Sequence, residues 1–363
     1  MKILFFTESG MGVSSLSTDQ ICELKRRNGD TYGVVSSYEQ DEGLIRRMED
    51  AGIELLHLDG MENHRHLGKH IGRLRGFIRN HGIEVVHAQT NWELLMVFLT
   101  KVSLLSCRRF RIFYTVHAFR NNRGWMKYLA VALMNVGLLV MADRVFCPSR
   151  YVMRHFGLVG YKAVLLPLGI DCRYFQSEWK FNEGVGISMV FPAQFRVGKR
   201  QDWIIGAFAE YIRRTGDGIS RLIFPGDGPL RGEMMAYARS LGIEDRVVFP
   251  GACSKEAVYG WYDSVNIAVV ASVSETFGQC IVEPFVMGKV VVSTPVGVAP
   301  EIIVDGVNGY LYDSVEELCG VMCRIAEDEG MVRRMGRMNF ERRVVFEWGR
   351  ITERYLKKAE PFK

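Results

Sequence analysis

The feature that most constrains the fold is a strand–loop–helix–strand unit in residues 267–297. It opens with Ile267–Val270, a short β-branched apolar run that is typical of a strand buried on both faces of a parallel sheet. Apolar residues then recur at helical spacing over Gln279–Met287, and Gly288 follows as a stop signal. Val290–Ser293 predicts the next strand. The polar loop between the first strand and the helix therefore lies where open parallel sheets bind ligands.

The loop and the helix of this unit carry two carboxylates, Glu275 and Glu283. A helix that begins near Gly278 points its first amide groups toward the loop, and its dipole favours an anion such as a phosphate there. The two carboxylates would then accept hydrogen bonds from sugar or ribose hydroxyls. Two glutamates at this spacing are more often solvated than functional, so the surrounding residues have to decide between these interpretations.

Short apolar runs alternate with helical stretches along most of the chain, which predicts doubly wound parallel α/β sheets. A length of 363 residues suits two such domains. The polar, aromatic stretch 171–186 is interpreted as a linker, so we expect domains at residues 1–170 and 187–345. The other expected strands are Lys2–Thr7, Thr31–Val35, Glu54–Leu58, Ile83–His87, Arg111–Val116, Arg144–Cys147, Ala163–Leu166, Ile187–Phe191, Arg221–Gly226 and Arg246–Phe249.

The composition, with 48% apolar and 24% charged residues, is that of a soluble globular protein. Eight cysteines without the spacing of a disulfide framework or a zinc site predict reduced thiols and a cytoplasmic setting. No signal-peptide pattern precedes the first strand. The apolar runs Leu94–Leu105 and Tyr128–Ala142 are too short or too interrupted to span a membrane, so we expect buried helices there.

Positive charge gathers in the first half of the chain. Residues 1–170 carry a net charge of +7, and residues 171–363 carry −2. Most of the excess lies between Met61 and Lys127, where cations alternate with the apolar residues of Leu67–Ile78. This stretch is either an ordinary amphipathic helix with a solvated basic face or a surface that rests on an anionic bilayer. A nucleic-acid partner is not expected, because no stacking platform or recognition motif accompanies the charge.

The residues around the two carboxylates follow the pattern S-x-x-E-T-F-G-x-x-x-x-E from Ser272 to Glu283. Thr294-Pro295-Val296-Gly297, Pro300-Glu301-Ile302 and an Asp-Gly-Val-Asn-Gly turn at 305–309 come after it. This combination resembles glycosyltransferase family 4, the retaining, nucleotide-sugar-dependent transferases of GT-B fold. Weaker matches, such as Pro148-Ser149 and Leu166–Asp171, extend the resemblance over most of the chain. It implies two Rossmann-like domains that face each other across a cleft, with a terminal helix in 346–363 that packs back on the first domain.

The resemblance implies a role for each polar group of this unit. Glu275 would hold sugar hydroxyls and stabilise positive charge at the anomeric carbon, and Glu283 would bind the ribose. The backbone amides of Thr276, Phe277 and Gly278 would hold the diphosphate.

The loop after the strand at 187–191 would supply the cations that neutralise the diphosphate. Lys199 matches the lysine of the family. Gln194 stands where the family usually has arginine, and we expect Arg196 to substitute for the missing guanidinium. Gly226 matches a turn that borders the nucleotide base in the family, although turn formation alone would also explain a glycine there.

In the first domain, Gly10 and Gly12 match the family glycines that approach the donor diphosphate. His117 matches the position whose imidazole lies against the donor sugar, whereas His87 is interpreted as structural. Candidates for an acceptor pocket are Asn91, Trp92, Glu93, Asn121 and Asn122.

The resemblance therefore implies a metal-independent, retaining hexosyltransferase. It would move a sugar from a nucleotide sugar, with UDP as the expected nucleotide, to an acceptor hydroxyl on a glycan or lipid-linked glycan in cell-surface polysaccharide or lipopolysaccharide assembly. No cofactor is expected, and the setting would be the cytoplasm, with peripheral attachment to the inner face of the cytoplasmic membrane left open. The alternatives are a non-catalytic sugar-nucleotide sensor, suggested by Gln194, another GT-B enzyme such as an epimerase or phosphorylase, and a dinucleotide oxidoreductase.

Overall fold

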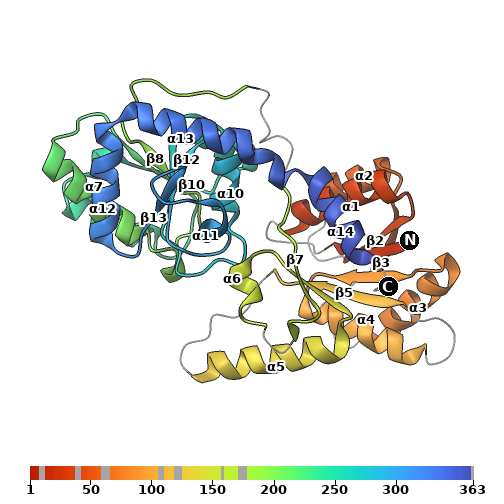
Figure 1. Ribbon diagram of the computed structural model, residues 1–363. Coiled ribbons are helices and arrows are strands. Elements are labelled where there is room, and N and C mark those ends of the chain that lie inside the picture. Colours follow the sequence, from red (N-terminus) through yellow and green to blue (C-terminus); the bar gives the residue numbers. More distant parts are fainter. Residues whose placement is uncertain are drawn as a thin grey trace. The chain divides into compact units, whose positions relative to one another are not determined.

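The computed structural model describes residues 1–7, 13–36, 42–58, 66–104, 110–117, 125–156, 159–170 and 178–360. The chain divides into two compact units (Figure 1). The first unit combines Met1–Asp171 with Phe346–Lys363, and the second unit spans Cys172–Val345. Each unit contains one parallel β-sheet with helices packed against it.

The sheet of the first unit has seven strands in the order β3-β2-β1-β4-β5-β6-β7. Every pair in it is parallel. The direction of strand addition reverses between β1 and β4, so the carboxyl ends of these strands flank a topological switch point, where doubly wound sheets bind ligands. The strands are β1 Ile3–Thr7, β2 Thr31–Ser36, β3 Glu54–Leu58, β4 Val85–Ala88, β5 Arg111–Thr115, β6 Arg144–Cys147 and β7 Ala163–Leu165.

Two apolar clusters cover the two faces of this sheet, because alternate residues of a strand point to opposite faces. One cluster joins the sheet to α3, α4, α5 and α6, and the other joins it to α1, α2 and α14. The helices are α1 Val13–Asn28, α2 Glu42–Asp50, α3 Leu67–His81, α4 Asn91–Ser103, α5 Trp125–Met141, α6 Arg150–Met153 and α14 Trp348–Ala359.

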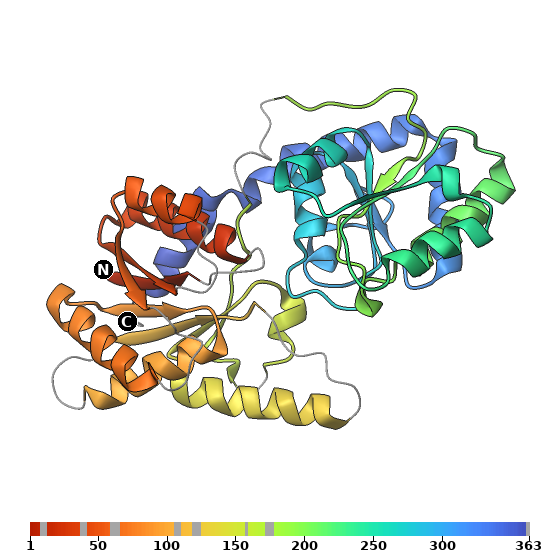
Figure 2. The same cartoon turned by 180° about the vertical axis from the view of Figure 1, so that it is seen from behind.

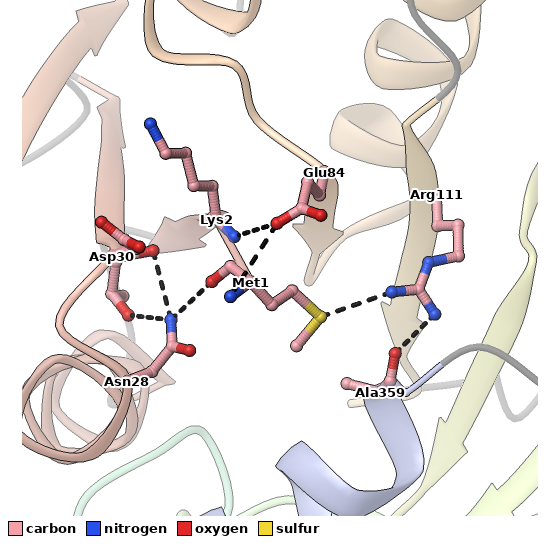
Figure 3. A network of polar contacts seen from close by, with 8 residues as sticks. Met1, Lys2, Asn28, Asp30, Glu84, Arg111 and Ala359 are labelled. Carbon is pink, nitrogen blue, oxygen red and sulfur yellow. Dashed lines mark hydrogen bonds and ion pairs between the residues drawn. The ribbon is translucent and has the colours of Figure 1, made fainter.

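The terminal helix α14 is held to the first unit at both ends. Its Trp348 and Tyr355 lie in the apolar cluster, and the Tyr355 hydroxyl lies 2.9 Å from Nδ1 of His87. At the other end of the helix, Arg111 donates a 2.5 Å hydrogen bond to the carbonyl of Ala359, as Figure 3 shows. Arg144 donates similarly to the carbonyl of Glu360 at 3.0 Å. Cations at the last carbonyls complement the helix dipole, so the arrangement favours docking of α14.

The sheet of the second unit has six strands in the order β10-β9-β8-β11-β12-β13, and its switch point lies between β8 and β11. All of its pairs are parallel. The strands are β8 Met189–Val190, β9 Leu222–Pro225, β10 Val247–Gly251, β11 Ile267–Val270, β12 Val290–Ser293 and β13 Gly309–Leu311. The α-helices are α7 Gln201–Thr215, α8 Arg231–Ser240, α9 Lys255–Asp263, α10 Gln279–Val286, α11 Ala299–Ile302, α12 Val315–Glu327 and α13 Glu329–Arg342. Short 3-10 helices lie at η4 Val197–Lys199, η5 Glu244–Arg246 and η6 Arg343–Phe346.

The described part of the expected linker, residues 178–186, is bonded to the second unit. Trp179 donates through its indole nitrogen to the carbonyl of Gly288 at 3.1 Å. The backbone amide of Asn182 donates to the side chain of Asn266 at 3.0 Å. These contacts make the stretch part of the second unit rather than a free connection.

The apolar and basic stretches of the first half fold differently from one another. The apolar side of α3 packs into the core while Lys69, Arg73 and Arg79 are exposed, so α3 is an amphipathic helix whose basic side is directed away from the core. The run Tyr128–Ala142 forms most of α5, yet Leu133, Val136 and Val140 are exposed, so the expectation of a buried helix is wrong for one face. Among the helices in the described ranges, none is long and apolar enough to cross a membrane.

Candidate functional site

The carboxyl ends of β8 and β11 bring two predicted residues together. These strands pair in parallel, and the loops that follow them are joined by a hydrogen bond from the Val273 amide to the Gly198 carbonyl at 2.9 Å. In the same loops, the ammonium of Lys199 donates to Oε1 of Glu275 at 2.5 Å. Their side chains are only 12% and 15% exposed, so the charges are largely removed from bulk water. A close, desolvated cation and carboxylate at a switch point are typical of a ligand-binding site.

The backbone of the Glu275–Gly278 loop is fixed from two sides. Gly278 precedes α10 with φ of +93°, and a Cβ there would lie 2.6 Å from the side chain of Ile281. From the β12 side, the Val298 amide donates to the carbonyl of Phe277 at 2.9 Å. Gly297 has φ of +54°, and a Cβ there would lie 2.3 Å from the same carbonyl oxygen. The glycines therefore allow a tight loop that ends at the amino terminus of α10, where an anion is favoured.

Two side chains of α10 lie in the same region. Cys280, next to the helix start, is a neutral thiol because burial, assisted by Glu275, raises its pKa well above the usual range. Glu283 is half-buried one turn further along and accepts a hydrogen bond from the hydroxyl of Tyr262 at 3.4 Å. Tyr262 belongs to α9 and is fully buried, and burial together with Glu283 raises its pKa, so it remains a donor. Tyr262 was not predicted from the sequence, because it belongs to no motif and lies 21 residues from its partner.

The loop after β8 carries the remaining predicted residues of the second unit. Gln194 is exposed, and its backbone carbonyl accepts a hydrogen bond from the side chain of Gln201 at 3.1 Å. Arg196 is also exposed and immediately precedes the turn that ends at Lys199. Gly226 has φ of +144°, and a Cβ there would lie 2.1 Å from the carbonyl oxygen of Ala193. Close backbone packing between the loops after β9 and β8 therefore explains why residue 226 is a glycine. This explanation is structural and does not depend on a bound nucleotide.

A second group of predicted residues lies at the carboxyl ends of β4 and β5 in the first unit. His117 follows β5, and its Nε2 is hydrogen-bonded to Oε1 of Gln89, which follows β4. Burial lowers the pKa of His117 to about 4, so the imidazole is neutral at physiological pH. Gln89 is 2% exposed, and within the described residues its amide nitrogen has no hydrogen-bond partner. Gln89 was not predicted from the sequence, because no local pattern distinguishes a glutamine two residues after a buried histidine.

The structure also places several other residues of the first unit that the sequence marked as possible site residues. The Glu93 carboxylate accepts from the amides of Gln89 and Thr90 in a capping box, which explains this residue as the start of α4. Asn91 accepts a hydrogen bond from Tyr114 at 2.7 Å. His87 is fully buried between Tyr355 and Thr115, in agreement with a structural role. Gly10, Gly12, Asn121 and Asn122 lie outside the described residues. In the described ranges, no group of three or more His, Cys, Asp or Glu side chains is arranged to hold a metal ion.

Solved structures show which known folds the chain is similar to. Anabaena HepE in complex with UDP and glucose superposes with a TM-score of 0.77 and 17% sequence identity over 98% of both chains. The apo form of the lipopolysaccharide outer core galactosyltransferase WaaB gives a TM-score of 0.77 and 16% identity over 99% of both chains. At these identities the likeness shows the fold, and it confirms two Rossmann-like α/β domains of the GT-B class.

Curated relatives match shorter stretches. The N-acetyl-alpha-D-glucosaminyl L-malate synthase of Bacillus anthracis is 29% identical over 169 residues, which are 46% of this chain and 42% of that protein. The Vi polysaccharide biosynthesis protein VipC/TviE of Salmonella typhi is 34% identical over 109 residues, 30% of this chain and 18% of that protein. The matches thus span less than half the length of these relatives.

Models of two protein families match the chain in succession. The model described as Glycosyltransferase Family 4 matches residues 12–174, and the one described as Glycosyl transferases group 1 matches residues 186–328. The matched ranges correspond to the first and second unit and leave few residues unmatched between residue 12 and residue 328. The chain therefore belongs to the glycosyltransferases in which a family 4 domain precedes a group 1 domain.

Proposed function

We propose that the chain transfers a hexose from a nucleoside-diphosphate sugar, with UDP as the nucleotide, to an acceptor hydroxyl, with retention of the anomeric configuration. The observation that carries this proposal is the Lys199–Glu275 pair at the switch point of the second unit, beside the amino terminus of α10. A cation and helix amides suit a diphosphate, and carboxylates suit the hydroxyls of the attached sugar and ribose.

In this proposal the second unit holds the donor. Lys199 and the first amides of α10 neutralise the diphosphate, and Arg196 supplies the second cation in place of the arginine that Gln194 replaces. Glu283, oriented by Tyr262, binds the ribose hydroxyls. The backbone of Thr276, Phe277 and Gly278 lines the diphosphate pocket, and Gly226 borders the base.

Transfer needs one bond to break and one to form at the same carbon. The bond from the anomeric carbon to the diphosphate oxygen breaks, and the acceptor oxygen bonds to that carbon on the same face. The acceptor proton moves to the departing phosphate oxygen, which the cations keep stabilised. Glu275 stabilises the positive charge that develops at the anomeric carbon. Because cationic side chains and amides neutralise the leaving group, the reaction as proposed needs no metal ion.

The first unit would contribute to the sugar and the acceptor. The neutral imidazole of His117 can hydrogen-bond a sugar hydroxyl without adding charge, and Gly10 and Gly12 would approach the diphosphate. The names of similar proteins, a Vi polysaccharide biosynthesis protein and a lipopolysaccharide outer core galactosyltransferase, support a glycan or lipid-linked glycan acceptor. The proposed setting is the cytoplasm, at the inner face of the cytoplasmic membrane, in the assembly of cell-surface polysaccharide or lipopolysaccharide.

The proposal is tested with radiolabelled nucleotide sugars and the variants Glu275→Gln and Lys199→Ala. Loss of a group that stabilises the transition state should lower kcat/KM for transfer, or for donor hydrolysis, by about 10²- to 10³-fold. Calorimetric titration with UDP should show at least about tenfold weaker binding for Lys199→Ala, because one charge-assisted contact is lost. Glu275→Gln should change UDP binding little, because UDP lacks the transferred hexose that Glu275 is proposed to contact.

The matched control is Glu210→Gln, which removes an exposed ion pair with Arg213 and Arg214 on α7 of the same unit. This variant should keep wild-type activity. Unchanged transfer by Glu275→Gln would show that the residue assignment is wrong.

A second candidate is a sugar-nucleotide sensor without turnover, which the exposed Gln194 in place of an arginine favours. In that case the wild-type chain would bind a nucleotide sugar in the titration and release no labelled sugar to water or to an acceptor. Restoring the cation with Gln194→Arg would then create turnover, because a guanidinium stabilises the leaving diphosphate.

A further inference from the structure

Helix α5 leaves an apolar stripe uncovered on the first unit. Leu133, Val136 and Val140 are 64%, 51% and 63% exposed, and their spacing of three and four residues places them on one face of the helix. Figure 1 shows α5 running along the outside of the first unit, with no labelled helix or strand on its outer side, and Figure 2 shows the same helix from behind. A surface helix of a globular protein usually turns a polar face to water. A contiguous exposed apolar face of this kind marks an interaction site.

The exposure is not the result of a loosely attached helix. On the inner side of α5, Leu138 is 1% exposed within the core, and Asn135 donates to the carbonyl of His155 at 3.0 Å. At the carboxyl end, Lys162 donates to the carbonyls of Leu139 and Ala142 at 2.6 and 2.7 Å. These contacts fix the rotation of the helix, so its outer stripe faces away from the core.

The sequence around α5 is strongly basic. Residues 94–170 contain eleven Lys and Arg side chains and a single acidic residue, Asp143. Asp143 is paired with Lys101 at 2.8 Å, so it leaves little negative charge on this part of the unit. Arg154 is exposed next to His155, and Tyr161 is 71% exposed beside Lys162. Apolar side chains flanked by cations and a tyrosine suit the interface between lipid headgroups and acyl chains.

We propose that this face, the stripe of Leu133, Val136 and Val140 flanked by Arg154 and Tyr161–Lys162, binds an anionic lipid bilayer. The apolar side chains enter the boundary between headgroups and acyl chains, and the exposed guanidinium of Arg154 contacts lipid phosphates. A second copy of the chain fits this face less well, because a two-fold contact would place one basic rim against the other. Binding at this face would bring the chain to a membrane that holds a lipid-linked acceptor. Only this biological purpose rests on the proposed function.

The test is flotation of the full chain, without nucleotide, with vesicles of phosphatidylcholine alone and of phosphatidylcholine mixed with phosphatidylglycerol. The wild type should float with the anionic vesicles and not with the neutral ones. Leu133→Gln with Val140→Gln should lower the bound fraction by at least about tenfold, since two apolar side chains no longer insert. Arg154→Glu should lower it by at least about fivefold, and added salt should weaken wild-type binding.

The matched control is Ile219→Gln, which replaces a 61% exposed apolar side chain in the second unit and should float like the wild type. Circular dichroism melting checks that each variant is folded. The proposal is overturned if the double variant floats like the wild type, if neutral vesicles bind as well as anionic ones, or if the chain ignores vesicles and forms a dimer that Leu133→Gln dissociates. UDP titration without vesicles is a separate measurement, so a failure here and a failure of the donor site are distinguishable.

Discussion

Tyr262 holds the second carboxylate of the candidate donor site from a position that no motif marks. Its hydroxyl donates to Glu283 while its ring is fully buried. Tyr262→Phe keeps the packing of the ring and removes this one donor, so Glu283 should be oriented less well toward the ribose. We expect UDP to bind about three- to tenfold more weakly, which corresponds to one modest hydrogen bond, and the preference for UDP over 2′-deoxy-UDP to shrink. Calorimetric titration with both nucleotides measures the two effects.

The control for this variant is Tyr312→Phe. Tyr312 is equally buried in the second unit, but its hydroxyl donates to the backbone carbonyl of Val270 at 2.9 Å. Losing that bond should lower the free energy of unfolding by about 1 kcal/mol and leave the ratio of the two affinities unchanged. If Tyr262→Phe also leaves the ratio unchanged, Glu283 does not act on the ribose through this contact.

Individual site residues differ in how far they could be predicted from the sequence. The pairing of Lys199 with Glu275 was within reach, because both lie at the carboxyl ends of predicted strands, where parallel sheets gather their ligands. Tyr262 and Gln89 were not, because each acts through a partner brought near only by the fold. Buried tyrosine and glutamine side chains carry no local pattern that separates such a role from ordinary packing.

At the scale of elements, a buried histidine connects the sheet of the first unit to its terminal helix. His87 of β4 lies between the hydroxyls of Tyr355 and Thr115, and burial lowers its pKa to about 3. The unfolded chain takes up a proton below about pH 6.5, whereas the folded chain does not, so the free energy of unfolding falls as the pH falls. Between pH 7 and pH 5 this histidine should account for a loss of about 2 kcal/mol, which His87→Gln should abolish.

Hydrogen exchange of peptides from β4 and α14 at several urea concentrations measures this loss, because the two units need not unfold together. Tyr355→Phe is the control, since it removes a hydrogen bond but keeps the titrating group. That variant should be less stable at both pH values and retain the wild-type pH dependence. An equal pH dependence in His87→Gln would mean that other groups cause the acid sensitivity.

Elements were predicted well where burial alone determines the residue types. β6, β11 and β12 have the predicted bounds, because strands buried on both faces are short and have little polar interruption. The exposed face of α5 was not predicted, because an apolar helix pattern does not say which side other elements cover. The bounds of β8, which were predicted too long, depend on where pairing with β9 and β11 ends rather than on hydrophobicity.

At the scale of the whole molecule, the chain passes between the two units twice, because the first unit takes both its first 171 residues and its last helix. Removing Phe346–Lys363 would take Trp348, Ile351 and Tyr355 out of the core of the first unit. Three large buried side chains at about 1.5–3 kcal/mol each represent a large share of the roughly 5–15 kcal/mol that stabilises a domain. The first unit of the truncated chain should therefore be largely unfolded at 37 °C.

The second unit should survive the same truncation, because Lys199, Glu275, Glu283 and Tyr262 all lie within Cys172–Val345. Limited proteolysis with mass spectrometry should show cleavage throughout residues 1–170 and protection of 178–345, while UDP still binds within a few-fold of the wild-type affinity. Ile351→Asp in the full-length chain tests the same contact without a deletion, since a carboxylate cannot be buried at that position without a partner. A protease-resistant first unit in both variants would show that α14 is not needed for its fold, and loss of UDP binding would show that the donor site needs more than the second unit.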